Sequence, residues 1–265
     1  MHAFEYHRPA SSKDAVSLIK NKSEARYLAG GQSLVQAMKL RLTSPSDLID
    51  LGTIKELAGI KVSSSAVEIG AMTRHADVEG SAAVKKAIPA LAALAGMIGD
   101  RQVRHMGTCG GSIANSDPAA DYPAAVLGLG ATVHTNKRKI EADKFFTGLY
   151  ETALEPGELI TSVSFPVPKR AAYMKFKNPA SRFAMVGVFV ADFGGKVRVA
   201  VTGAGASVFR QAEMEKALSA KFAPESVANI KVKADGLNND LHASPEYRAH
   251  LVTVMAKRAV EAALK

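Results

Sequence analysis

Two short segments built around adjacent glycines constrain this 265-residue chain more than any other feature of its sequence. "AGGQSL" occupies residues 29–34 and "TCGGS" occupies residues 108–112, and each follows an apolar or strand-like run. Adjacent glycines let a backbone approach a ligand closely and turn several N–H groups in one direction. Such N–H groups bind anions, and the hydroxyls of Ser33, Thr108 and Ser112 add donors. The two segments therefore predict two loops that meet on one pyrophosphate.

The residues of the second segment also allow other chemistry. A catalytic cysteine needs a lowered thiol pKa, and no Cys-His signature surrounds Cys109, so a small packing residue is the favoured interpretation. Asp117 and Asp121 could form an acid/base pair, but a carboxylate after a phosphate-binding loop more naturally accepts hydrogen bonds from ribose hydroxyls or loop N–H groups. For Asp117, an N-cap of the following helix is an equally good interpretation. No side chain is expected to be catalytic.

The net charge of +9 invites a nucleic-acid-binding interpretation, but its basic residues are scattered. The one dense basic run, residues 137–139, lies between two strand-like stretches and is interpreted as a solvated hairpin turn. No nucleic-acid-binding signature is present. The seven histidines show no metal-ligand spacing, so no metal site is expected.

One cysteine cannot form an internal disulfide, which favours a cytoplasmic location. No apolar run reaches the roughly 18 residues of a membrane span, and the first ten residues lack the apolar region of a secretory signal. A membrane span is therefore not expected.

Strand-like and helix-like segments follow one another in a pattern typical of an α+β fold. Pro166 and Pro168 mark a boundary, after which the pattern is that of a hairpin around Gly194 and Gly195 followed by helices. A helix-like pattern from His75 to Gly99 is interrupted at Pro89. Further strands are expected at residues 4–9, 25–31, 47–51, 60–62, 66–71, 131–135 and 140–142, and further helices at 11–22 with Ser12 as N-cap, 33–42, 124–130, 213–220, 224–232 and 244–264.

Four segments carry a resemblance to a known family: "AGGQSLVQAMKLRL", "GDRQVRHMGTCGGSIANSDPAADYPA", "FFTGLYETALEPGELITSVSFP" and "DLHASPEYRAHL". In this order they resemble the FAD-binding subunit of the molybdenum hydroxylases, the xanthine dehydrogenase and aerobic carbon monoxide dehydrogenase family. The resemblance covers nearly the whole chain. It implies a two-lobed α/β FAD-binding domain of the PCMH/VAO type at 1–166, with lobes of about 1–57 and 58–166. A smaller C-terminal domain of antiparallel strands and helices is implied at 167–265.

The resemblance also implies a set of FAD-binding residues. The backbone from Ala29 to Val35 would wrap the pyrophosphate, and the second glycine segment would form a second clamp. Asp121 matches an acidic residue that contacts FAD, and Lys177 matches a lysine beside the flavin. Ser112 stands where the family often has Asn, and Leu159 or Ile160 where it has an apolar residue lining the flavin pocket. The full set is Ala29, Gly30, Gly31, Gln32, Ser33, Leu34, Val35, Thr108, Gly110, Gly111, Ser112, Asp117, Asp121, Leu159, Ile160 and Lys177.

The single cysteine bears on the partners that the resemblance implies. A plant-type iron–sulfur cluster needs four cysteines, so [2Fe–2S] clusters are expected on a small partner subunit and the molybdenum cofactor on a large one. The expected function is oxidoreductase electron transfer from those clusters through FAD to an external acceptor, without turnover of the organic substrate by this chain alone. A stand-alone FAD-dependent reductase and a non-redox nucleotide-binding module remain as alternatives.

Overall fold

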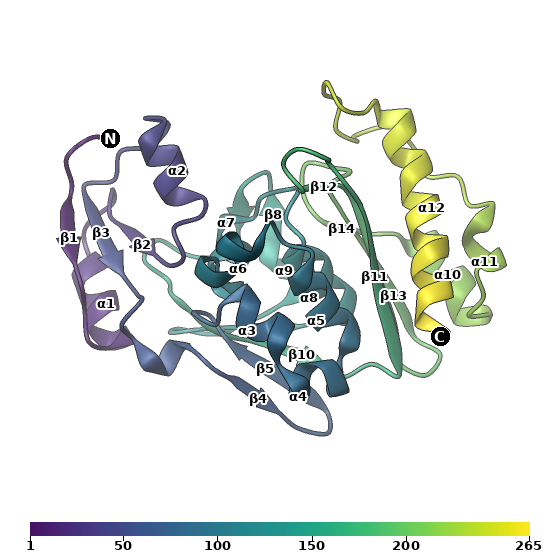
Figure 1. The fold of residues 1–265 in the computed structure, drawn as a ribbon, viewed down its shortest axis with the longest axis horizontal. Coiled ribbons are helices and arrows are strands. Elements are labelled where there is room, and N and C mark those ends of the chain that lie inside the picture. Colours follow the sequence, from purple (N-terminus) through teal and green to yellow (C-terminus); the bar gives the residue numbers. More distant parts are fainter.

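The computed structural model describes residues 1–265, and its sheets succeed one another from one end of the molecule to the other (Figure 1). The N-terminal lobe holds a parallel three-stranded sheet in the order β1-β3-β2. Its apolar core includes Ala15, Ile49 and Leu57. Helix α1 begins after Ser11, whose hydroxyl accepts from the N–H of Asp14, so the N-cap is Ser11 and not Ser12. The elements of this lobe are β1 (Glu5–His7), α1 (Ser12–Ile19), β2 (Arg26–Leu28), α2 (Leu34–Lys39), β3 (Asp47–Asp50) and the 3₁₀ turn η1 (Lys55–Leu57).

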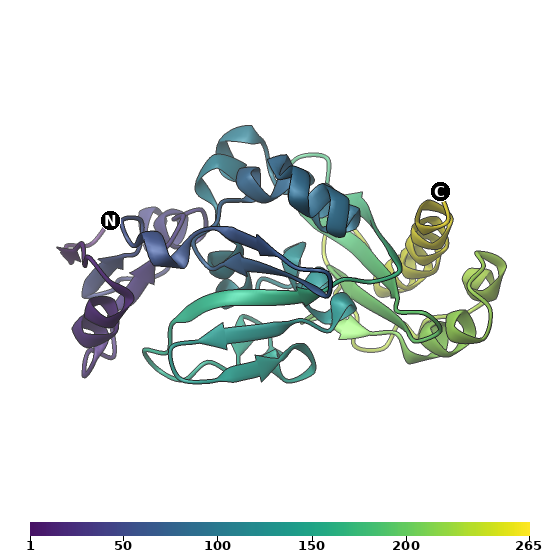
Figure 2. The ribbon, with the colours of Figure 1, turned by 90° about the horizontal axis from the view of Figure 1, so that it is seen from below.

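The second lobe is built on an antiparallel five-stranded sheet in the order β4-β5-β10-β6-β7, whose strands run across the middle of Figure 2. Its central strand β10 comes from late in the lobe, so strands that are distant in the chain lie next to each other in this sheet. Its strands are β4 (Ile60–Val62), β5 (Ala66–Gly70), β6 (Thr132–Thr135), β7 (Lys139–Glu141) and β10 (Ile160–Pro166), with a small separate pair β8 (Phe146–Gly148) and β9 (Glu151–Thr152). Its helices are α3 (His75–Gly80), α4 (Ala82–Ala87), α5 (Pro89–Gly96), α6 (Arg101–Met106), α7 (Cys109–Asn115), α8 (Tyr122–Leu129) and α9 (Ala142–Phe145).

Two local predictions for this lobe need correction. The helical stretch from residue 75 breaks at Ser81 as well as before Pro89, because the Ser81 hydroxyl accepts from the N–H of Val84 and starts α4 afresh. Residues 109–115 form a helix, so the second glycine pair lies within its first turn and not after a strand.

A four-stranded antiparallel sheet in the order β11-β12-β13-β14 follows the second lobe. Every residue of β12 is buried, because helices α10 and α12 pack on this sheet from one side and α8 from the other. All of α8 is likewise buried, as expected for a helix that is apolar all round. The elements are β11 (Arg170–Lys177), β12 (Ala184–Asp192), β13 (Val197–Thr202), β14 (Phe209–Arg210), α10 (Ala212–Ala220), α11 (Glu225–Ala228) and α12 (Pro245–Ala263).

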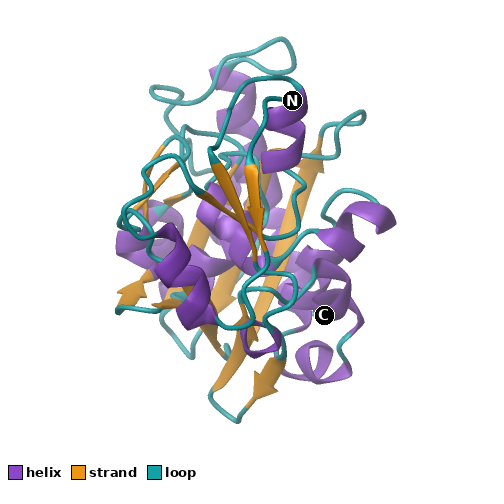
Figure 3. Cartoon of the chain, turned by 90° about the vertical axis from the view of Figure 1, so that its left-hand side faces the viewer, coloured by secondary structure: helices purple, strands orange, loops and turns teal.

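The predicted hairpin between β12 and β13 is confirmed. Its turn residues Gly194 and Gly195 have φ angles of 85° and 108°, which only glycine adopts readily. Figure 3 shows the strands from the side of the N-terminal lobe, running between layers of helices. The α+β fold class is confirmed by this arrangement.

Candidate functional site

A cavity of about 600 Å³ opens between the N-terminal lobe and the second lobe, and the loop between β11 and β12 reaches its edge. Both glycine segments line it. The predicted residues along its wall are Ala29, Gly30, Gly31, Gln32, Ser33, Leu34, Thr108, Gly110, Gly111, Ser112, Asp117, Asp121, Leu159 and Ile160. The structure thus brings to one cavity all of the predicted residues except two.

The first glycine segment presents unpaired backbone donors. None of the N–H groups of residues 29–34 donates to a protein acceptor, although this segment lines the cavity. The left-handed conformation of Gly31, at φ 72°, lets the chain turn here. A run of adjacent free N–H groups of this kind forms a concavity suited to an anion. The hydroxyl of Ser33 also has no protein partner, so it is available as a further donor.

The second glycine segment works differently, and its predicted role as an N–H clamp is wrong. The N–H groups of residues 109–112 donate to the carbonyls of Thr73, Ala71 and Thr108 and to the Thr108 hydroxyl, at 2.8–3.2 Å. Thr108, the N-cap of α7, occupies the donors of Gly111 and Ser112, and the chain at Ala71 and Thr73 occupies those of Gly110 and Cys109. The segment therefore forms part of the cavity wall and contributes the Ser112 hydroxyl as a possible donor, but no free backbone N–H groups.

The glycines instead allow the two segments to touch. A Cβ on Gly30 would lie 2.1 Å from the carbonyl oxygen of Met106 and 2.7 Å from Cα of Gly107. A Cβ on Gly111 would lie 3.2 Å from Cβ of Ala29, and one on Gly110 would lie 2.5 Å from Cβ of Ala71. A side chain at Gly30 would push the two segments apart, so their meeting depends on this residue, whereas a side chain at Gly110 would separate the second segment from Ala71.

Asp121 is held by two side chains from β11. Its Oδ1 accepts from the hydroxyl of Tyr173 at 2.5 Å, and its Oδ2 accepts from Nζ of Lys175 at 2.9 Å. The carboxylate is 4% exposed and faces the cavity wall. Since Lys175 matches its charge, Asp121 offers the cavity a neutralised carboxylate rather than a free negative charge.

Asp117 does not cap α8. Its Oδ1 accepts from the N–H of Ala119 at 2.9 Å, and its carbonyl accepts from Ala120. These bonds close a turn that ends before Tyr122, where α8 begins, so the N-cap interpretation is wrong. Its other carboxylate oxygen lies 3.4 Å from the hydroxyl of Tyr150.

Two predicted residues lie outside the cavity lining. Val35 packs back onto its own loop, where its Cγ2 would lie 3.0 Å from a Cβ at Gly31. Lys177 ends β11 beyond a bulge that shifts the pairing after Phe176, and its side chain is exposed. Two residues earlier in β11, Lys175 is the lysine that the structure places beside Asp121.

Cys109 is completely buried in the core of the second lobe. Burial raises the pKa of its thiol to about 12, so the thiolate that a nucleophile requires is not formed near neutral pH. The structure contains no cluster of three or more His, Cys, Asp or Glu side chains that could hold a metal ion.

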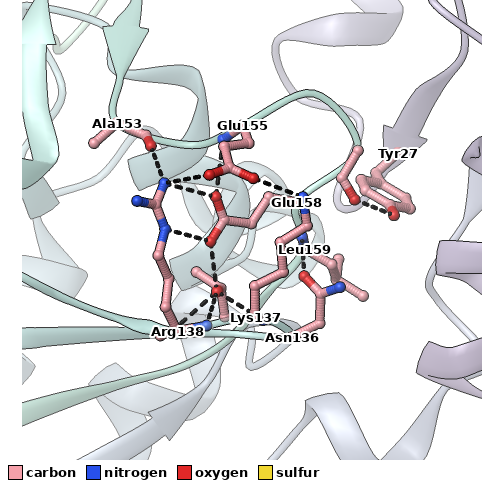
Figure 4. A network of polar contacts seen from close by, with 10 residues as sticks. Tyr27, Asn136, Lys137, Arg138, Ala153, Glu155, Glu158 and Leu159 are labelled. Atoms are coloured by element: carbon pink, nitrogen blue, oxygen red, sulfur yellow. Dashed lines mark hydrogen bonds and ion pairs between the residues drawn. The ribbon is translucent and has the colours of Figure 1, made fainter.

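An ion-pair network around the buried carboxylate of Glu158, a cavity-lining residue, holds the loop that precedes β10 (Figure 4). Glu158, whose side chain is fully buried, accepts from Nε and Nη2 of Arg138 at 3.1 and 3.0 Å and from the hydroxyl of Thr135 at 2.7 Å. Burial alone would raise the pKa of Glu158, but Arg138 and the other donors lower it to about 2. Tyr27 of the N-terminal lobe donates to the carbonyl of Gly157 at 3.0 Å, so the same loop also ties the two lobes together.

The sequence pattern did not indicate this network or the cavity residues outside the predicted set, among them His75. The predicted hairpin turn at residues 137–139 is confirmed, since it joins β6 and β7. Arg138 in this turn is not simply solvated, because it pairs with the carboxylate of Glu158. The segment "EPGELI", residues 155–160, carried part of the resemblance, but no role was predicted for its second glutamate, Glu158. His75 also lines the cavity, and nothing in its sequence neighbourhood distinguishes it from a surface histidine.

The sequence model of the family described as "FAD binding domain in molybdopterin dehydrogenase" matches residues 2–168. The chain belongs to this family. It is 36% identical to the carbon monoxide dehydrogenase medium chain of Afipia carboxidovorans, over 98% of this chain and 96% of that one. The nicotine 6-hydroxylase medium subunit of Paenarthrobacter nicotinovorans is 35% identical over 97% and 96% of the two chains.

Solved structures agree with the sequence comparisons. A chain of carbon monoxide dehydrogenase from Hydrogenophaga pseudoflava, in a form lacking the Mo-pyranopterin moiety, superposes with a TM-score of 0.90 at 37% identity, over 99% of this chain and 98% of that one. As a member of this family, the chain is an FAD-binding medium subunit of the kind found in molybdenum hydroxylase complexes, which are oxidoreductases. No helix in it combines the length and apolar character needed to cross a membrane.

Proposed function

We propose that this chain binds FAD in the cavity between its lobes and relays electrons from iron–sulfur clusters of a small partner subunit to an external acceptor. The observation that carries the proposal is the run of free N–H groups at residues 29–34 on the cavity wall, which suits a pyrophosphate. Bound FAD would supply the redox chemistry, and the protein would hold and shield it.

The chain's own residues divide this task. Ala29 to Leu34 would hold the pyrophosphate through backbone donors, and Ser33 and Ser112 would add hydroxyls. Asp121, neutralised by Lys175, would accept hydrogen bonds without placing a net negative charge beside the cofactor. Leu159 and Ile160, both buried and both lining the cavity, would pack against an apolar part of the ligand.

The partner subunits and the domain division belong to the same proposal. A large subunit would carry the molybdenum cofactor and select the organic substrate. The one cysteine of this chain cannot hold an iron–sulfur cluster, so the clusters would lie on a small subunit. The division at residues 166 and 167 is supported by sheet membership, because β10 ends at Pro166 in one sheet and β11 begins at Arg170 in another. A reducing cytoplasm would suit the lone thiol.

The deciding experiment measures flavin reduction in the assembled complex and in the isolated chain. After excess FAD is removed by gel filtration, the chain is expected to keep visible flavin bands and to release FAD, not FMN, on denaturation. In the anaerobic complex, an oxidisable substrate should bleach those bands, whereas the chain alone with the same substrate should not change.

Two other outcomes would contradict the proposal. Bleaching of the isolated chain by a reduced nicotinamide with turnover of a second substrate would favour a stand-alone reductase. A complex that reduces its acceptor at full rate without flavin on this chain would leave only a nucleotide-binding role.

A further inference from the structure

His75 is a buried titratable residue on the cavity wall to which the proposed function gives no role. It is the first residue of α3, it is 4% exposed, and it lines the cavity. Its backbone N–H donates to the carbonyl of Gly107 at 3.0 Å. Gly107 in turn lies against Gly30, so the histidine stands next to the point where the two glycine segments meet.

The two ring nitrogens of His75 have different surroundings. Nδ1 is enclosed and has no hydrogen-bond partner, and the ring packs against Tyr122 at a centroid distance of 5.3 Å. Nε2 also makes no hydrogen bond within the protein, but it is not enclosed in this way. A Cβ on Gly107 would lie 2.6 Å from Nε2, so this cavity-lining glycine packs directly against the ring and a side chain there would collide with Nε2.

The protonation state follows from these surroundings. Burial, assisted by the charge of Arg104, lowers the pKa of His75 to about 4, so the imidazole is neutral near pH 7 and carries one N–H. An N–H enclosed without an acceptor is costlier than one that can reach a partner. The proton therefore belongs on Nε2, where an acceptor in the cavity can receive it.

We infer that His75 positions the cofactor by donating a hydrogen bond from Nε2 to an oxygen of FAD. The inference rests on the proposed function, because it needs FAD in this cavity. Gly107 contacts both His75 and the loop of free N–H groups, so a pyrophosphate oxygen is one candidate acceptor. A flavin carbonyl is the other oxygen of FAD with the right chemistry. The experiment separates them.

The test compares three substitutions of His75. The side-chain amide of His75→Gln can reach the place of Nε2, whereas that of His75→Asn reaches only the place of Nδ1, and His75→Phe has no donor. FAD dissociation constants, measured by quenching of flavin fluorescence, are expected to rise roughly 3- to 10-fold for Asn and Phe and to recover in Gln. His105→Gln is the matched control, because His105 is exposed and bonds only its own helix at Arg101.

ADP, which keeps the pyrophosphate and lacks the flavin, identifies the acceptor. Equal weakening of ADP and FAD by His75→Phe would assign a pyrophosphate oxygen, and weakening of FAD alone would assign the flavin. In the wild-type chain, ¹⁵N signals of the His75 ring, assigned with His75→Gln, should show the Nε2–H tautomer and shift when FAD is added.

The inference and the proposed function fail in different ways. A wild-type chain that binds no FAD in the complex overturns the proposed function first. A wild-type chain that binds FAD, with folded Phe and Asn variants of unchanged affinity and ring signals that do not move, overturns the inference alone. Equal losses in Gln, Asn and Phe would also overturn it, since they would show a packing role without a hydrogen bond.

Discussion

Nζ of Lys175 lies 2.9 Å from Oδ2 of Asp121, and both side chains are almost completely removed from solvent, at 2% and 4% exposure. The pair joins the start of α8 to β11, and Lys175 also donates to the carbonyl of Met97 at 3.2 Å. The last sheet is therefore anchored to the wall of the cavity by one buried charge pair. An ion pair in such a place is costly to break, because the remaining charge stays buried.

Replacing Lys175 by Met should destabilise the chain by about 3 kcal/mol, since Asp121 would be left without its counter-charge. The double variant Lys175→Met with Asp121→Asn should recover part of that loss, because no unpaired charge remains. Urea unfolding measures both. Lys257→Met, which breaks an exposed pair with Glu261 at 3.9 Å, is the control and should change the stability by less than about 1 kcal/mol.

Gly30→Ala should weaken FAD binding at least roughly tenfold, because its methyl group would meet the Met106 carbonyl at 2.1 Å and separate the two glycine segments. Gly80→Ala is the matched control, since no atom lies within 4 Å of its added Cβ. Equilibrium dialysis with FAD compares them, and equal affinities would show that the contact of the segments does not shape the site.

The buried His75 should make the unfolding free energy of the chain fall in mild acid. Its pKa is about 4 in the folded chain and about 6.5 when unfolded, so the unfolded state binds more protons between these values. The folded chain is therefore expected to lose up to about 3 kcal/mol as the pH falls from 6.5 to 4.

The check is the difference in unfolding free energy between the wild type and His75→Phe across that range. The variant should lack the His75 share of the pH dependence, so the difference should shrink as the pH falls. The pKa of Glu158 is lowered to about 2, so its own effect on the unfolding free energy falls mainly below this pH range. That effect is the same in both proteins and cancels in the difference. A difference that stays constant from pH 6.5 to 4 would contradict the assignment.

Glu158→Gln should loosen the loop that ties the two lobes, because the amide cannot match the charge of Arg138. We expect a loss of about 2 kcal/mol in stability and weaker FAD binding. Thermal unfolding with and without FAD reports both. Glu141→Gln removes an exposed pair with Lys144 at 3.1 Å and should leave both measurements unchanged.

Cys109 should not react with a thiol reagent in the native chain and should react fully once the chain is unfolded. Its sulfur is buried, and burial raises the pKa of the thiol to about 12. Ellman's reagent with and without denaturant is the measurement. Rapid reaction of the native chain would revive the interpretation of Cys109 as a nucleophile.

The sequence alone determined the α+β class, the Gly194–Gly195 hairpin and the two glycine segments, because turns and alternating apolar residues are local properties. It also predicted both glycine segments of the cavity wall, while other lining residues such as Tyr27, His75 and Phe183 were not predicted. Local pattern could not show that Ser81 starts a new helix within the stretch that begins at His75, since a serine in such a stretch is compatible with either a cap or a continuous helix.

The tertiary structure decided which donors are free and which charges are paired. The N–H groups at 109–112 are occupied because α7 starts there and lies against Ala71 and Thr73, whereas those at 29–34, in residues that line the cavity, have no protein acceptor. Asp121 finds Lys175 on a strand that follows it by some fifty residues. Hydrogen bonding and burial depend on neighbours that are distant in the chain, so the same residue types acquire opposite roles only when the fold brings those neighbours to them.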